Sequence, residues 1–108
     1  MADYTIIPGN EYPTNIVELT KKLRDITNRD IEVLCQKEKD YQGSWKKRGG
    51  VGAFMMLARK WDRIEAHLES EGVNWDIFEA IRKDKRTEGV LDDVRDLRRY
   101  LLLIETEL

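Results

Sequence analysis

Residues 53–70, AFMMLARKWDRIEAHLES, decide the fold class of this chain of 108 residues. Large apolar side chains recur there at intervals of three and four residues: Phe54, Leu57, Trp61, Ile64 and Leu68. This spacing places them on one face of an α-helix, and Gly72 follows as a stop signal. We therefore expect a helix over residues 53–70 whose apolar face packs into the core.

The N-terminal part of the chain shows the same periodicity. Apolar residues from Ile16 onward favour one long helix over residues 15–41, which continues through the low-propensity residues Thr27 and Asn28. The alternative is a break in the helix near these two residues. Prolines and a glycine interrupt residues 1–13, so we expect an irregular arm there.

The C-terminal part predicts two more helices. Asn74 is expected to cap a short helix that reaches Ile81, and apolar residues at helical spacing predict a final helix over residues 90–108. The charged residues 82–88 are expected to form a solvated connection. Since no segment alternates like a strand, the predicted fold is all-α, a bundle of three long helices and one short helix that makes residues 14–108 a single domain.

Residues 41–52, YQGSWKKRGGVG, separate the first two long helices. They hold four of the seven glycines in the chain, and so many glycines in a short stretch disfavour a continuous helix. We expect a loop there, with Lys46, Lys47 and Arg48 between an aromatic residue and the glycines.

Composition excludes several kinds of site. Cys35 and His67 are the only cysteine and histidine, which rules out an internal disulfide and any cysteine or histidine metal cluster, and makes a nucleophilic triad a poor candidate. Nineteen basic and 21 acidic residues give a net charge of −2, which argues against nucleic-acid binding. Without an apolar run of membrane-spanning length, we expect a soluble cytoplasmic protein.

Carboxylates are the abundant reactive groups, and four of them form two pairs. Asp62 and Glu65 are three residues apart, as are Asp93 and Asp96, and each pair borders an apolar stripe. If the two helices pack antiparallel, the four side chains can line one edge of the interface and hold a divalent cation. The alternative is that they lie on solvated helix faces and form salt bridges.

A combination of motifs favours the metal site. The motifs are Lys39-Asp40-Tyr41-x-Gly43-Ser44-Trp45, Gly52-x-Phe54, Arg59-Lys60-x-Asp62-Arg63-x-Glu65 and Leu91-x-Asp93-x-x-Asp96-Leu97-x-x-Tyr100. Together they resemble the nucleotide modification associated helical domain of bacteria and their phages, which is itself similar to the MazG-like, all-α nucleoside triphosphate pyrophosphohydrolases. The resemblance covers residues 37–104. Asp62 and Asp93 stand where the MazG-like enzymes have glutamate, and Arg99 stands where the related domain often has asparagine.

The resemblance implies a metal-dependent hydrolase that cleaves a (deoxy)nucleoside triphosphate to a monophosphate and pyrophosphate. It implies that Asp62, Glu65, Asp93 and Asp96 hold Mg²⁺, for which Mn²⁺ is a possible substitute. Phosphoryl transfer needs a cation, a positioned water and nearby basic groups, so the chemistry agrees with the residue types present. Glu65, with its longer side chain, is our candidate for orienting the water. Base and sugar preference stay open.

Substrate contacts are expected from the loop and from the helix over residues 53–70. The candidates are Asp40, Tyr41, Trp45, Lys46, Arg48, Arg59, Lys60 and Arg63. The basic residues suit the triphosphate, and the two aromatic rings suit stacking on a base. The alternatives are that the loop is a simple turn, that its aromatic rings pack on the bundle, and that Asp40 caps the turn. Trp61, Tyr100 and Cys35 are expected to be core residues.

Two further hypotheses concern assembly and a different function class. The family resemblance and the small size predict a homodimer or homotetramer, because a second subunit would close a shallow nucleotide groove. The rival to the enzyme is a non-catalytic helical module that senses nucleotides or binds another protein, and such a module would not respond to Mg²⁺.

Overall fold

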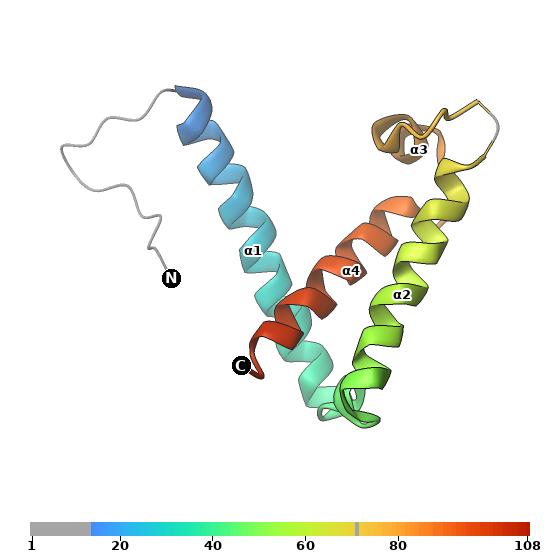
Figure 1. Cartoon of the computed structure of the whole chain (residues 1–108). Coiled ribbons are helices and arrows are strands. Elements are labelled where there is room, and N and C mark those ends of the chain that lie inside the picture. The colour runs from blue at the N-terminus through green and yellow to red at the C-terminus, as the bar shows by residue number, and fades with distance from the viewer. Residues whose placement is uncertain (1–13, 71) are drawn as a thin grey trace. The chain divides into compact units, whose positions relative to one another are not determined.

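The structure is a computed structural model, and it describes residues 14–70 and 72–108. Within these ranges all regular secondary structure is helical, in the order α1 (Thr14–Tyr41), the short 3-10 helix η1 (Ser44–Lys46), α2 (Gly49–Leu68), α3 (Ile77–Lys83) and α4 (Val90–Glu105) (Figure 1). The described part contains no strand, so the predicted all-α class, with three long helices and one short helix, is confirmed. The predicted arm over residues 1–13 lies outside the described residues.

Two compact units divide the chain between Lys37 and Glu38, which lies inside α1. The described part of the first unit is the helix up to Lys37. Thr20 and Thr27 bond their hydroxyls to the carbonyls four residues before them, Ile16 and Leu23, both at 2.8 Å. These bonds use the threonine hydroxyls inside the helix, and α1 continues through Asn28 as predicted.

The apolar stripe of α1 lies at the surface. Ile16, Leu19, Leu23 and Ile26 are each at least 39% exposed. A single helix cannot cover its own apolar side, so these side chains find no cover within their unit. Cys35 is also exposed, and its predicted place in the core is therefore wrong.

The second unit, Glu38–Leu108, is built on α2 and α4, which pack against each other and run in opposite directions (Figure 1). Lys46, just before α2, pairs with Glu107, just after α4, whereas Lys60 and Arg63 in the second half of α2 pair with Asp93 near the start of α4. The antiparallel arrangement on which the carboxylate hypothesis depended is therefore confirmed.

The core of this unit lies where the end of α2, α3 and the start of α4 meet. Val73, Ala80 and Val90 are buried there, with Leu68 and Ile81 among the side chains packed against them. Val90 has no exposed surface. Because these side chains are small, the core is modest, and much apolar surface lies outside it.

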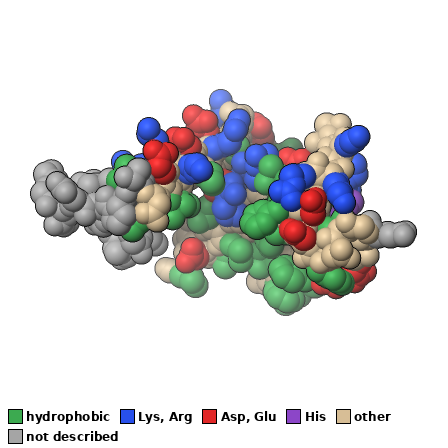
Figure 2. All heavy atoms as spheres, turned by 90° about the horizontal axis from the view of Figure 1, so that it is seen from above, with side chains coloured by type: hydrophobic (Ala, Val, Ile, Leu, Met, Phe, Trp, Pro, Cys, Tyr) green, Lys and Arg blue, Asp and Glu red, His purple; other side chains and the backbone are tan. Residues whose placement is uncertain are grey.

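Several large apolar side chains that the periodicity assigns to the interior are exposed. Phe54 is 62% exposed and Trp61 58%, so the prediction that Trp61 is a core residue is wrong. The reason is that α4 covers only the side of α2 that carries Ala53 and Ile64, which are buried. Tyr100 is half-buried. Figure 2 shows hydrophobic side chains at the surface among the charged ones.

The helix ends differ from prediction at three places. α2 begins at Gly49, so three glycines expected in the preceding loop lie in its first turn. Asp76, not Asn74, caps α3, because its carboxylate accepts hydrogen bonds from the N–H groups of Phe78 and Glu79 at 3.0 and 3.2 Å. Asn74 has a φ of 54°, in the left-handed region, and belongs to the turn before the cap. α4 ends at Glu105 and does not reach residue 108.

The connection between α3 and α4 is ordered by one carboxylate rather than simply solvated. Asp84 accepts hydrogen bonds from the Val90 N–H at 2.7 Å, from the Arg86 N–H at 3.1 Å and from both Nε and Nη2 of the Arg86 guanidinium. These bonds, with the arginine side chain contributing most, hold the pKa of Asp84 well below its usual range. A Cβ atom on Gly89 would stand 2.5 Å from Asp84 Oδ2, so the loop closes tightly over this carboxylate.

Candidate functional site

An ion-pair cluster joins the middle of α2 to the first turns of α4. Lys60 Nζ lies 2.9 Å from Asp96 Oδ2 and 3.6 Å from Asp93 Oδ1, and Arg63 Nε lies 3.2 Å from that same Asp93 oxygen. The three-residue spacing puts Lys60 and Arg63 on one face of α2, and Asp93 and Asp96 on the facing side of α4. Positive side chains on α2 therefore face negative side chains on α4.

Asp93 is the most unusual member of this cluster. Its side chain is only 3% exposed, and its Oδ2 atom is buried without a hydrogen-bond donor in the described part of the chain. A buried carboxylate oxygen without a donor costs about 1–3 kcal/mol. A bound cation, a water molecule or another donor placed at this oxygen would remove that cost.

The other predicted carboxylate pair lies elsewhere on α2. Asp62 is exposed, and the half-buried Glu65 accepts a hydrogen bond from the indole N–H of Trp61 at 2.9 Å. Among residues 14–70 and 72–108, no three Asp, Glu, His or Cys side chains come close enough together to hold a metal ion. The structure thus brings Asp93 and Asp96 together but does not gather all four carboxylates, and the four-ligand magnesium site stays a prediction.

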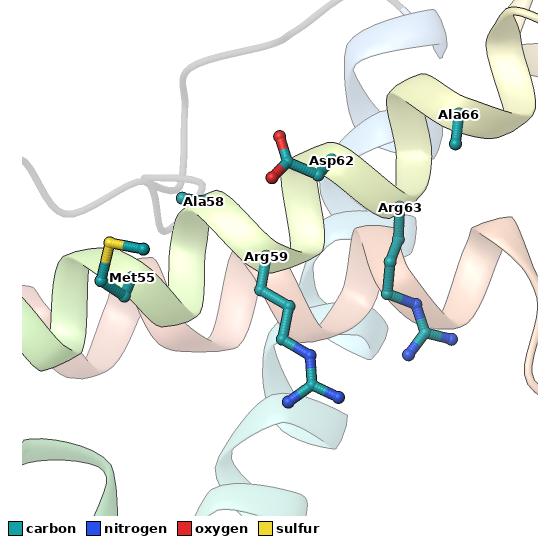
Figure 3. Close-up of a pocket in the computed structure, with 6 residues that line it drawn as sticks. All are labelled: Met55, Ala58, Arg59, Asp62, Arg63 and Ala66. Atoms are coloured by element: carbon teal, nitrogen blue, oxygen red, sulfur yellow. The ribbon is translucent and has the colours of Figure 1, made fainter.

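A shallow pocket of about 390 Å³ lies along α2 beside the cluster. It is lined by Met55, Ala58, Arg59, Asp62, Arg63 and Ala66 (Figure 3). The surface is depressed there because the side chains of the two alanines are small. The guanidinium groups of Arg59 and Arg63 extend in the same direction, whereas the carboxylate of Asp62 points away from them (Figure 3). Arg59 is exposed and forms no ion pair within the described part of the chain. Two guanidinium groups so placed can bind a phosphate chain.

A second pocket of about 360 Å³ lies at the other end of the α2–α4 pair. Trp45, Lys46, Gly49, Gly50, Ala53, Ile104, Glu107 and Leu108 line it. Lys46 Nζ bonds to Glu107 Oε1, and this hydrogen bond, together with the carboxylate charge, raises the pKa of Lys46. Both side chains are about half exposed, so the ion pair stands at the rim of the pocket.

The other substrate residues predicted in the loop do not line this second pocket. Asp40 and Tyr41 are exposed in the last turn of α1, and Tyr41 is 65% exposed. Arg48 is the exposed residue before α2 and gives it no side-chain cap. Of the loop candidates, only Trp45 and Lys46 line the pocket.

Sequence reasoning missed Ile104 and Glu107 as pocket residues, and it missed the role of Asp84. Ile104 and Glu107 reach the pocket only because α4 returns antiparallel to α2, and no local motif marks that contact. Asp84 lies in a charged stretch whose composition is typical of solvent-exposed connections.

No protein-family model, curated protein or solved structure matches this chain. No helix within residues 14–70 and 72–108 combines the length and the apolar character that a membrane crossing requires.

Proposed function

We propose that this chain is a metal-dependent nucleoside triphosphate pyrophosphohydrolase that releases a monophosphate and pyrophosphate from a (deoxy)nucleoside triphosphate. The observation that carries the proposal is the buried, donor-free oxygen of Asp93, next to Asp96 and directly opposite two cationic side chains. The motif resemblance points to the same residues. We propose that this enzyme acts in the cytoplasm, in the nucleotide metabolism of a bacterium or a phage.

The carboxylates of Asp93 and Asp96 fit Mg²⁺. This ion keeps several waters and is usually held by one or two carboxylates together with the phosphates of its substrate, so four protein ligands are not required. Asp93 and Asp96 would hold it, and Mn²⁺ has the same preference for oxygen ligands. When bound, the ion neutralises charge on the phosphate oxygens. Asp62 and Glu65 would join them as metal ligands only if the helix surface rearranges.

The cationic residues would bind and orient the triphosphate. Arg59 has no carboxylate partner among the described residues, and Arg63, which pairs with Asp93 through Nε, extends beside it (Figure 3). Both guanidinium groups would donate hydrogen bonds to phosphate oxygens. Lys60 bridges Asp93 and Asp96, and it would turn to the phosphates when a divalent cation replaces its ammonium group. Glu65, oriented by the Trp61 indole, is our candidate to accept a proton from the attacking water.

Self-association is part of the proposal. Exposed apolar side chains on α1 and α2, with Leu23, Phe54 and Trp61 among them, are surfaces that a homodimer or homotetramer would cover. Sedimentation of the full chain tests this part separately from catalysis.

Release of pyrophosphate tests the activity. Purified protein is incubated with common ribo- and deoxyribonucleoside triphosphates, with Mg²⁺, Mn²⁺ or EDTA, and Asp96→Asn is compared with Asp25→Asn, an exposed carboxylate on α1. We expect cation-dependent release that Asp96→Asn abolishes and Asp25→Asn leaves unchanged. Equal release by the wild type and Asp96→Asn on every nucleotide would refute the enzyme.

One observation favours the second candidate, a non-catalytic helical module. Lys60 and Arg63 already neutralise Asp93 and Asp96, as the salt-bridge interpretation of these carboxylates predicted. In such a module Mg²⁺ would not change the melting temperature, whereas filling a cation site raises it by mass action.

A further inference from the structure

The residues that line the pocket between the start of α2 and the end of α4 suit a planar ring. The indole of Trp45 and the side chain of Ile104 give it apolar walls, and the ion pair of Lys46 and Glu107 borders it. Its volume of about 360 Å³ is within the range of small-molecule sites, which run from about 300 to 1,000 Å³.

The glycines that line this pocket show how closely a ligand can approach the backbone. A Cβ atom built on Gly49 or Gly50 would meet no atom within 4 Å, so open space lies directly over the backbone of the first turn of α2. A flat ring can therefore approach the main chain more closely than any side chain there would allow. Gly49 has a φ of 74°, but Gly50 is helical, so at Gly50 backbone conformation does not require a glycine.

The pocket and the ion-pair cluster lie along one seam. Ala53 of the pocket and Lys60 of the cluster are seven residues apart on α2, which is about two turns or about 10 Å of helix. Both face α4, where Ile104 and Asp96 are their counterparts. A nucleotide has a similar layout, with a flat base at one end and a chain of phosphates at the other.

We propose that this pocket binds the base of the nucleoside triphosphate, stacked on Trp45 and lying over Gly50, while the phosphates extend along α2 to Arg59, Lys60 and Arg63. Lys46 and Glu107 then meet the polar edge of the base, one as a donor and the other as an acceptor. The inference rests on the proposed function, since it assigns a part of the same substrate to a second place on the same helix pair.

Direct binding tests it without relying on turnover. Calorimetry measures the dissociation constants of α,β-methylene analogues of the common nucleoside triphosphates, and of inorganic tripolyphosphate, in Mg²⁺. Two variants alter the pocket in different ways: Trp45→Ala takes away the stacking ring, and Gly50→Leu adds a side chain where a Cβ atom meets no atom within 4 Å. Phe78→Ala, which truncates an exposed ring on α3 that lines neither pocket, is the control. Circular dichroism verifies that each variant is helical.

We expect both pocket variants to weaken nucleotide binding about 10- to 100-fold, the loss typical of one base–aromatic stack, and to leave tripolyphosphate binding unchanged. Wild-type nucleotide affinity in Gly50→Leu would overturn the inference, and so would an equal loss of tripolyphosphate binding.

The two proposals fail in distinguishable ways. Pyrophosphate release that depends on Asp96 but is insensitive to Gly50→Leu would refute the base pocket alone. Nucleotide binding that Gly50→Leu removes, in a protein that releases no pyrophosphate, would refute the enzyme and support the pocket. A wild-type protein that binds no nucleotide would overturn both.

Discussion

Replacing Lys60 by Met removes the ammonium group that bridges Asp93 and Asp96, and keeps an unbranched apolar side chain of similar length. In the wild type this ammonium lies 2.9 Å from Asp96 Oδ2 and 3.6 Å from Asp93 Oδ1, and the lysine side chain is 17% exposed. After the substitution the nearly buried Asp93 has Arg63 as its remaining cation, and the Asp96 carboxylate has lost the partner at 2.9 Å.

The size of the effect follows from burial. Removing one partner of a fully buried ion pair costs about 3–5 kcal/mol, but Asp96 is 28% exposed and Arg63 stays on Asp93. We therefore expect a loss of about 1–3 kcal/mol, the range for leaving a buried polar group without its partner. In a domain of this size that corresponds to a melting temperature lower by about 5–20 °C.

Thermal unfolding followed by circular dichroism in EDTA measures this change, with Lys85→Met as the matched control. Lys85 is exposed and forms no ion pair within the described residues, so its loss should have little effect. Under the proposed function, millimolar Mg²⁺ should restore stability to Lys60→Met more than to the wild type, because no ammonium competes for the two carboxylates. A Lys60→Met protein as stable in EDTA as Lys85→Met would refute the reasoning about the cluster.

Three further predictions concern the α3–α4 connection and the core. The pKa of Asp84 is lowered, so its carboxylate stabilises the fold at pH values above its ordinary pKa of 3.8, and this contribution is lost as the pH falls further. Asp84→Asn should therefore have a lower melting temperature than the wild type at neutral pH, and its melting temperature should depend less on pH below pH 4. Gly89→Ala brings a methyl group against the Asp84 carboxylate and should destabilise the chain by about 1–3 kcal/mol in urea unfolding; unchanged stability would contradict this close approach. Val90→Ala leaves a cavity at a fully buried position and should cost about 1–3 kcal/mol, whereas an exposed Val51→Ala should be almost neutral.

Helical periodicity was enough to predict the four helices, but not all of their boundaries. A helix over residues 15–41 was expected and Thr14–Tyr41 is observed, because an apolar repeat persists over that whole stretch. The start of α2 was predicted at residue 53 instead of Gly49, because glycine has low helix propensity and its frequency there indicated a loop. Gly49, the first residue of α2, has a φ of 74°, which glycine adopts without steric cost as the chain enters the helix.

The candidate site was predicted in its residues but not in its pairing. Spacing shows that Asp93 and Asp96 share one face of a helix, and antiparallel packing brings that face to α2. Which side chains of α2 meet them depends on the rotation and axial position of the two helices, which spacing does not specify. For this reason Lys60 and Arg63, rather than Asp62 and Glu65, lie opposite the α4 carboxylates.

The glycines in the first turn of α2 also affect how the chain opens. Glycine has the lowest helix propensity of any residue except proline, so this turn is the part of α2 with the least intrinsic stability. Its backbone amides, which have no intrahelical acceptor, should exchange with solvent well before those around the buried Ile64. The turn that lines the proposed base pocket would then be the least protected part of α2. A ligand bound in the pocket should slow the exchange of these amides, so hydrogen exchange at this single turn would report whether the pocket is occupied.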